Sequence, residues 1–291
     1  MCSAPIKKRP YYIDAPPYRR TSNGILILHR LCHELNNAGY EAYVSTNITN
    51  PDWWTPTLTD EVRARHKASQ SNPIGIYPEI RTGNPFATPV VVRYLLNYPG
   101  LLGGPENFHA SDYLLAFTEL IRERTNAHST LFMQTTDRSI FNNLDNPFDD
   151  QRQGHLIYPG RHNDARLRYP ALFDNTTVIT SSWPEDHSTL AALFRKSERL
   201  YLFEPSNLAV EAVLCGCPAI ILPSPLFDGQ GLAVRELGHW GMAFDECPES
   251  ILEAKETLAK LTESATKAEI CFPYALNRFI TISQSLPLIA P

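Results

Sequence analysis

Short apolar runs of strand length alternate along this chain with segments whose apolar residues recur at helical spacing. At the start, residues 10–13 are typical of a strand, residues 25–35 of one face of a helix, and residues 41–45 of a second strand. Gly39 follows the helical segment, at the position where a glycine commonly ends a helix. A strand, a helix and a strand in this order open a parallel α/β sheet, so the alternation predicts an α/β fold.

The 291 residues are enough for one large domain or two of ordinary size. Residues 146–154 are polar and rich in turn residues, and a second α/β pattern begins after them at 155–158. We therefore predict a domain boundary at 150, with residues 1–150 before it. Further predicted elements are a helix at 89–97, a helix capped by Ser188, and two helices at 249–265 and 269–285.

The charge and cysteine content exclude several classes of protein. The formal net charge of −5 provides no overall basic field for nucleic acid or an anionic membrane. The basic N-terminal cluster around Lys7 is interpreted as a solvated tail, with a lipid-surface role as the alternative. No apolar run reaches the roughly 18 to 20 residues of a membrane span, and the start lacks a secretory signal, so we expect a cytoplasmic protein. The scattered cysteines favour reduced thiols, and Cys215 and Cys217 lack further ligands at zinc-like spacing, so no metal is expected.

The most informative stretch runs from Leu200 to Leu222, where a strand leads through a short turn into a helix. The first turn of that helix has N–H groups without partners inside the helix, and the helix dipole adds positive charge there, which suits a diphosphate. Glu211, one turn further, can accept hydrogen bonds from a ribose diol. The residues expected to face the diphosphate are Ser206, Asn207 and Leu208.

This stretch resembles the donor-binding half of GT-B glycosyltransferases. Leu208 and Glu211-Ala212, followed by Gly216 and Pro218, match the run L-x-x-E-A-x-x-x-G-x-P found in many of them. The resemblance implies that Glu211 binds the nucleotide ribose and that the preceding turn binds the diphosphate. It also implies two Rossmann-like domains facing across a cleft. The donor would be bound by residues 151–269, and the acceptor by residues 1–150 with a C-terminal helix at 270–291 that crosses back.

Other segments match the same family. Arg161 lies where relatives place a basic residue that reaches the diphosphate, with a solvated loop arginine as the alternative. Ser182 and Trp183 lie where relatives place the nucleobase pocket, although a packing role for Trp183 is equally compatible. Gly24 corresponds to the glycine-bearing turn before the first helix, and we group it with the donor-binding residues.

The catalytic candidates are three residues of the first domain. Residues 74–100 resemble a segment of bacterial surface-polysaccharide glycosyltransferases, and Glu79 within it is the first candidate for the general base. Asp14 is the second candidate and His109 the third, each with an ordinary polar loop role as the alternative. Relatives of the retaining branch have two glutamates with a longer spacing than Glu204 and Glu211, so the sequence leaves inversion and retention open.

The sequence therefore predicts a metal-independent hexosyltransferase-type enzyme with no cofactor besides its donor substrate. Its expected partners are a nucleotide-diphosphate sugar and a glycan or lipid-linked glycan acceptor, with no nucleic acid. At most a peripheral contact with the inner face of the membrane is expected, and the role is surface-polysaccharide synthesis. Two alternatives are a nucleotide-sugar 2-epimerase of the same fold and a non-catalytic GT-B-like binding domain.

Overall fold

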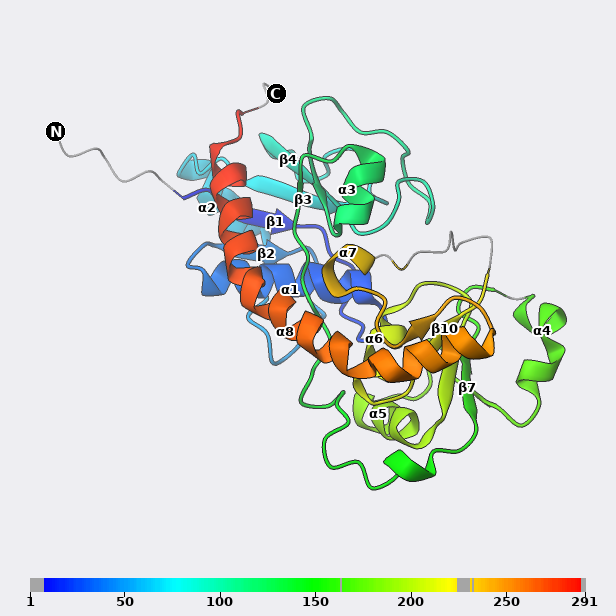
Figure 1. Cartoon of the computed structure of the whole chain (residues 1–291). Helices are drawn as coiled ribbons and strands as arrows, with labels where there is room; N and C mark the ends of the chain where they lie inside the picture. Colours follow the sequence, from blue (N-terminus) through cyan, green and yellow to red (C-terminus); the bar gives the residue numbers. More distant parts are fainter. Residues whose placement is uncertain (1–7, 163, 224–230, 232, 289–291) are drawn as a thin grey trace. The chain divides into compact units, whose positions relative to one another are not determined.

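The computed structural model describes residues 8–162, 164–223, 231 and 233–288 (Figure 1). Lys7 of the basic N-terminal cluster and the last residues of the predicted 270–291 segment lie outside this description. Contacts divide the chain into two compact units. Unit 1 comprises Met1–Thr135 and Cys271–Pro291, and unit 2 comprises Thr136–Ile270.

Unit 1 contains a six-stranded parallel sheet in the order β2-β1-β3-β4-β5-β6. Ile13 in β1 pairs with Val44 on one side and with Ile76 on the other, so β1 lies between β2 and β3. The strand order therefore reverses between β1 and β3. The strands are β1 (Tyr11–Ile13), β2 (Ala42–Val44), β3 (Ile74–Pro78), β4 (Val90–Leu95), β5 (Tyr113–Ala116) and β6 (Ser129–Thr130). The helices are α1 (Asn23–Asn37), α2 (Asp60–Ala68), α3 (Glu119–Thr125) and the second part of α8 (Pro248–Ser285).

The first helix forms as its sequence predicts. The apolar face of α1, from Leu28 through Leu31 to Leu35, is buried. Gly39 has a φ of +80° and its N–H donates to Asn36 O, which ends the helix at a conformation that glycine adopts without strain. The prediction of a strand, a helix and a strand at the start of the chain is confirmed.

The predicted helix at 89–97 is wrong, because these residues contain strand β4. All six residues of β4 are buried, and the strand pairs with β3 and β5. A strand covered on both faces is largely apolar and shows no alternation, as in β4, where Arg93 is the one charged residue, so its pattern cannot be told from that of a buried helix. The β-branched run Val90–Val92 is the local signal that favours a strand.

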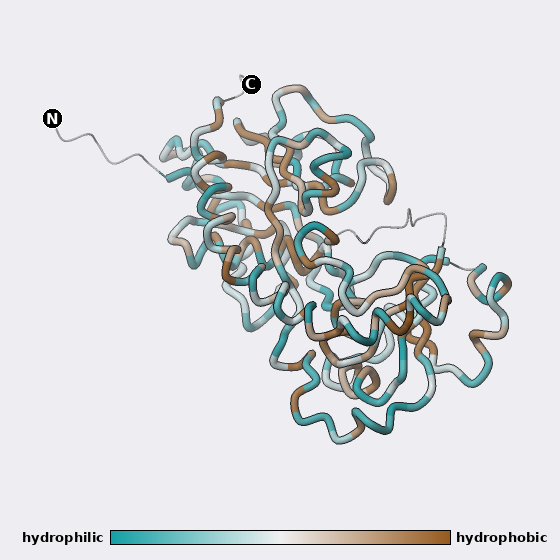
Figure 2. The backbone as a smooth tube through the Cα atoms, in the orientation of Figure 1, coloured by the Kyte–Doolittle hydropathy of each residue, from teal (hydrophilic) through white to brown (hydrophobic). Residues whose placement is uncertain are grey.

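Unit 2 contains a five-stranded parallel sheet in the order β11-β10-β9-β7-β8, and here the order reverses between β7 and β9. Apolar stretches of the backbone in Figure 2 coincide with strands of the two sheets. The strands are β7 (His155–Tyr158), β8 (Thr177–Val178), β9 (Arg199–Leu202), β10 (Ala219–Ile221) and β11 (Met242–Ala243). The helices are α4 (Ala165–Arg168), α5 (His187–Lys196), α6 (Asn207–Leu214), α7 (Val234–Leu237), the first part of α8, and the 3₁₀ turns η1 (Asp149–Gln151) and η2 (Pro170–Phe173).

Helix α5 is capped by Asp186 and not by Ser188 as predicted. The Asp186 side chain accepts a hydrogen bond from the Thr189 N–H at 2.7 Å. Ser188 is the second residue of the helix, because the carboxylate two residues earlier already satisfies the first turn.

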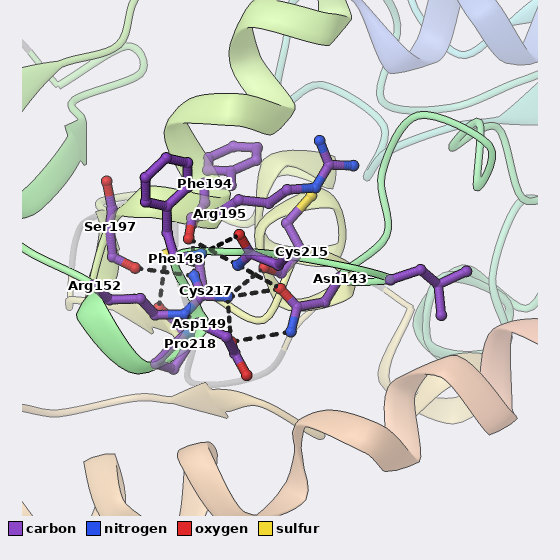
Figure 3. Close-up of polar contacts among 12 residues, drawn as sticks. Asn143, Phe148, Asp149, Arg152, Phe194, Arg195, Ser197, Cys215, Cys217 and Pro218 are labelled. Atoms are coloured by element: carbon purple, nitrogen blue, oxygen red, sulfur yellow. Dashed lines mark hydrogen bonds and ion pairs between the residues drawn. The ribbon is translucent and has the colours of Figure 1, made fainter.

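Residues 146–154, predicted as a linker, belong to unit 2, which begins at Thr136. Arg152 attaches this segment to the helices of the unit, and Arg195 attaches the residues just before it (Figure 3). The Arg152 guanidinium donates to the carbonyls of Phe194 and Cys215 near the C-terminal ends of α5 and α6, each at 2.8 Å. Arg195 donates back to the carbonyl of Asn142 at 2.7 Å. A polar composition is therefore compatible with tight attachment, because the side chains that attach the segment satisfy backbone carbonyls.

The two helices predicted at 249–265 and 269–285 are one continuous helix, α8, with Pro273 inside it. A proline within a helix removes one hydrogen bond and costs about 3 kcal/mol. Apolar side chains buried on both sides of Pro273, Leu261 before it and Phe279 after it, offset this cost. The end of α8 is also held in unit 1, where Gln284 exchanges two hydrogen bonds of 2.9 Å with the backbone of Arg9.

Candidate functional site

Each sheet reverses its strand order once, and residues singled out in the sequence lie at both reversals. In open α/β sheets, ligands bind outside the carboxyl ends of the strands at the point of reversal. In unit 1, Asp14 follows β1 and Glu79 follows β3. In unit 2, Arg161 lies in the turn after β7, and Glu204 lies just after β9.

The turn after β7 and the end of β9 meet closely in unit 2. Gly160 has a φ of +61°, and a Cβ added there would lie 2.5 Å from Oε1 of Glu204. Nη1 of Arg161 lies 4.0 Å from the second carboxylate oxygen of Glu204. The Arg161 side chain is 58% exposed, whereas that of Glu204 is 9% exposed. Because residue 160 is a glycine, the buried carboxylate of Glu204 can pack against the turn that contains the exposed guanidinium of Arg161.

Replacing Gly160 by Ala is expected to destabilise unit 2. The substitution puts a Cβ in a left-handed backbone conformation and against Glu204, and together these effects should lower the free energy of unfolding by about 1–3 kcal/mol. Gly154→Ala is the matched control, because Gly154 has a φ of +68° but nothing within 4 Å of an added Cβ. Denaturant unfolding gives the free energy of unfolding of both variants, and the difference between their losses is the cost of the contact with Glu204. Equal losses would show that the contact with Glu204 is unimportant.

The N-terminal turn of α6 contains the residues predicted to face a diphosphate. Ser206 caps the helix, and its Oγ accepts from the Leu208 N–H at 3.3 Å. Asn207 donates from Nδ2 to Thr136 Oγ1 at 3.0 Å and to Glu211 Oε1 at 2.8 Å. Glu211 is therefore a buried carboxylate oriented by an amide one turn earlier. This turn follows β9, so it lies at the carboxyl edge of the sheet, the same edge as Gly160 and Arg161 after the parallel strand β7.

Ser182 and Trp183 lie in a turn after β8, the strand next to β7, and hydrogen bonds within the turn fix its backbone. The N–H groups of both residues donate to Thr180 Oγ1, at 3.3 Å and 3.0 Å, and Trp183 O accepts from the Thr180 N–H at 2.9 Å. The Trp183 side chain remains 43% exposed. An exposed indole fixed by its backbone at the carboxyl side of a sheet can stack on a planar ring.

In unit 1, Asp14 is an ion-paired carboxylate. Its partner Arg81 follows the neighbouring strand β3, with Nη2 of Arg81 at 3.2 Å from Oδ1 and a closer contact from Nε. Ser45 Oγ also donates to Asp14, at 3.4 Å. The sequence analysis did not single out Arg81. The sequence did contain a signal for it: Arg81 is positively charged and follows β3 closely, as the negatively charged Asp14 follows β1.

Glu79 is buried, with 3% of its surface exposed, and it joins the ends of β3 and β4. Its Oε2 accepts from the Leu96 N–H at 2.9 Å. Burial raises the pKa of the Glu79 carboxyl, and hydrogen bonds from backbone N–H groups, including that of Leu96, partly oppose this rise. A carboxylate with a raised pKa at a strand end has the properties of a proton acceptor.

The other two predicted residues of unit 1 are placed differently from Asp14 and Glu79. His109 lies in the turn that leads into β5, before a strand and not after one, and its Nδ1 pairs with Ser111 Oγ at 2.7 Å. The structure therefore does not place His109 after a strand end as it does the two carboxylates. Gly24 was predicted in the turn before the first helix but is the second residue of α1. A Cβ there would make an ordinary contact of 3.5 Å with Leu96.

Within the described ranges, no group of three or more His, Cys, Asp or Glu side chains is arranged to hold a metal ion. Among the same residues, no helix is long and apolar enough to cross a membrane.

No protein-family model matches the chain, and no curated protein matches it. Similar solved structures include a glycosyltransferase from Rickettsia africae, with a TM-score of 0.56, 8% identity, and coverage of 96% of this chain and 98% of that chain. The glycosyltransferase SnogD from Streptomyces nogalater has a TM-score of 0.45 and 12% identity, covering 95% and 99%. A candidate UDP-N-acetylglucosamine 2-epimerase from Listeria monocytogenes has a TM-score of 0.45 and 11% identity, covering 97% and 99%.

The likeness to the Rickettsia structure, together with the two parallel sheets, confirms the predicted fold class. The chain has an α/β fold of two Rossmann-like units, of the GT-B type, with a long C-terminal helix.

Proposed function

We propose that the chain is a glycosyltransferase that moves a sugar from a nucleotide-diphosphate sugar to a hydroxyl group of a glycan or glycolipid. One observation carries this proposal. At the strand-order reversal of unit 2, Gly160 and Arg161 meet Glu204 beside the N-terminal turn of α6. This is the place in an open α/β sheet where a diphosphate would be bound, and it combines a cation with the positive end of a helix.

The donor would lie along the carboxyl edge of this sheet. Its diphosphate would face Arg161 and the first turn of α6, and its nucleobase would stack on the exposed ring of Trp183. Glu211 would accept hydrogen bonds from the ribose. The carboxylate is already oriented by Asn207, so little conformational freedom would be lost on binding.

As the glycosidic bond breaks, negative charge grows on the departing nucleotide diphosphate. Arg161 and the N–H groups of α6 would stabilise that charge, which is the main way in which a fixed electrostatic environment accelerates such a reaction. If the reaction inverts the anomeric centre, Glu79 of unit 1 would remove the proton from the acceptor hydroxyl. If it retains, the donor phosphate would take the proton and Glu79 would position groups.

The acceptor is proposed to be a growing surface polysaccharide or its lipid-linked precursor, with the enzyme in the cytoplasm or at the inner face of the membrane. The resemblance of residues 74–100 to polysaccharide glycosyltransferases supports this choice of acceptor.

A thermal-shift screen of nucleotide-diphosphate sugars tests the proposal, because a donor that binds only the folded state raises the melting temperature. A donor that raises the melting temperature is then incubated with the protein, once with candidate acceptors and once without any acceptor. Transfer to an acceptor supports the proposal. Isomerisation of the donor alone would identify a 2-epimerase instead, and the absence of donor binding would argue for a non-catalytic GT-B-like domain.

Activity is expected to survive chelation of divalent ions. Arg161 and the N-terminus of α6 supply positive charge where a metal ion would otherwise act, so EDTA should leave the initial rate of transfer nearly unchanged. The rate is measured with EDTA, and with EDTA followed by excess Mg²⁺ or Mn²⁺. A rate abolished by EDTA and restored by either ion would contradict this assignment of the phosphate site.

A further inference from the structure

At the reversal of unit 2, one nitrogen of a buried histidine side chain has no hydrogen-bond partner among the residues that the structure describes. His162 closes the turn after β7, where its backbone N–H donates to Pro159 O at 3.1 Å. The residue is only 9% exposed. Its Nε2 is enclosed by protein and makes no hydrogen bond with any residue that the structure describes.

A buried imidazole nitrogen without a partner is costly, because it loses its hydrogen bonds to water and gains none in return. Such a group in a folded protein therefore calls for an explanation, such as local strain, a catalytic role, or a bound water molecule or ion. Among the described residues, His162 is not part of a group of three or more His, Cys, Asp or Glu side chains that could hold a metal ion. The place of His162 in the fold therefore indicates the partner.

His162 belongs to the same short turn as Gly160 and Arg161. The Arg161 guanidinium is mostly exposed and lies 4.0 Å from Glu204, which is longer than a hydrogen bond. Its N–H groups can therefore turn to a second anion. A diphosphate that pairs with Arg161 would bring several acceptor oxygens to the turn that contains His162, and an imidazole N–H can donate to such an oxygen.

We propose that His162 is a second phosphate-binding side chain of unit 2, with Nε2 donating to an oxygen of the nucleotide diphosphate. This inference rests on the proposed function, since it assumes that unit 2 binds a nucleotide-diphosphate donor. Arg161 attracts the diphosphate from the exposed side, and His162 binds it from the buried side of the same turn.

The proposal predicts opposite effects of one substitution on binding and on stability. His162→Phe replaces the unpaired nitrogen by an apolar ring of similar shape. The melting temperature without nucleotide should therefore stay the same or rise, because Nε2 makes no hydrogen bond with a described residue that the substitution would remove. The affinity for the nucleoside diphosphate should fall by roughly 10- to 100-fold, the usual effect of losing a hydrogen bond to a charged group.

The experiment uses the full chain and calorimetric titration with UDP, GDP, ADP, CDP and TDP, continued with the one that wild type binds best and with its nucleoside. His162→Phe should lose affinity for the diphosphate and not for the nucleoside. His162→Gln keeps an N–H donor and should recover part of the affinity. His155→Phe is the control, because His155 lies at the opposite end of β7 and its buried Nδ1 makes no hydrogen bond among the described residues, although it lies 3.6 Å from the Glu198 carboxylate. It should bind the diphosphate like wild type.

The outcomes separate this inference from the proposed function. If wild type binds none of the nucleoside diphosphates, the proposed function fails. If wild type binds one and His162→Phe binds it equally well, only the role of His162 is overturned. An equal loss for the nucleoside, or an affinity loss that only follows a fall in melting temperature, would also overturn it. If His162→Phe does not fold, His162→Leu, which also lacks an N–H donor, takes its place: a loss of affinity confined to the diphosphate supports the proposal, and unchanged binding overturns it.

Discussion

Replacing Glu79 by Gln is expected to lower turnover by about 10²–10⁴-fold, while the affinity for the donor changes little. Glutamine has nearly the same size, and its side-chain oxygen can still accept the hydrogen bond from the Leu96 N–H. It cannot accept a proton. The donor is proposed to bind to unit 2, whereas Glu79 belongs to unit 1, so the two measurements should separate.

The pH dependence provides a second measurement of the same residue. Burial raises the pKa of Glu79, so the acidic limb of kcat/KM in wild type should lie above the ordinary pKa of a glutamate and should be absent in Glu79→Gln. For stability, a raised pKa in the folded state means that stability is fully present below the unfolded pKa and declines as pH rises through the folded value. Glu79→Gln should therefore not lose stability at neutral pH, and this is checked by denaturant unfolding.

Near-normal turnover in Glu79→Gln would contradict the assignment of Glu79 as the base. Parallel tests of Asp14→Asn and His109→Ala then distinguish the remaining candidates. Loss in Asp14→Asn would point to the carboxylate paired with Arg81, and its thermal stability must be measured because this change also breaks an ion pair. Normal turnover in all three variants would favour the donor phosphate of a retaining mechanism.

The second large effect is expected on stability, at the buried ion pair of Arg93 and Asp112. Nε of Arg93 lies 2.7 Å from the Asp112 carboxylate, and the two side chains are only 5% and 4% exposed. Asp112→Asn would leave a buried guanidinium without its counter-charge, which costs about 3–5 kcal/mol. The melting temperature should fall on the order of 10 °C.

This ion pair also supports the candidate site of unit 1. Arg93 donates to the carbonyls of Arg81 and Gly83, at 2.9 Å and 2.6 Å, and so fixes the loop whose Arg81 side chain pairs with Asp14. Glu119→Gln is the control, because its ion pair with Arg122 on α3 is 35–40% exposed and a glutamine oxygen can still accept the hydrogen bond from Thr130, so stability there should stay near that of wild type. A loss in Asp112→Asn as small as that of the control would show that the pair contributes little.

Local signals in the sequence determined a large part of the fold. Helix α1 and its end at Gly39 follow from periodicity and glycine, and the strand, turn and helix from β9 to α6 follow from an apolar run and the cap at Ser206. These features depend on residues within a few positions of one another. The sequence for this reason placed Ser206, Asn207 and Leu208 in the first turn of a helix.

The predictions that were wrong concern features for which the local signal is ambiguous. Strand β4 lies between β3 and β5 with both of its faces buried, and nothing within residues 89–97 records the distant segments that surround it. The helices predicted at 249–265 and 269–285 are one helix, α8, and nothing within residues 266–268 records that Leu261 before them and Phe279 after them are both buried.

By itself, the sequence determined which segments are strands followed by functional turns, because capping, periodicity and turn residues act over a few positions. Only the tertiary structure decided the strand order, since the order depends on how distant segments bury the faces of a whole sheet. The strand order places β1 beside β3, so that Arg81 meets Asp14, and β7 beside β9, so that Arg161 meets Glu204. Burial in that second turn also leaves Nε2 of His162 without a hydrogen bond among the described residues. No motif marks such a nitrogen, because what surrounds a side chain is a property of the folded unit and not of its neighbours in the sequence.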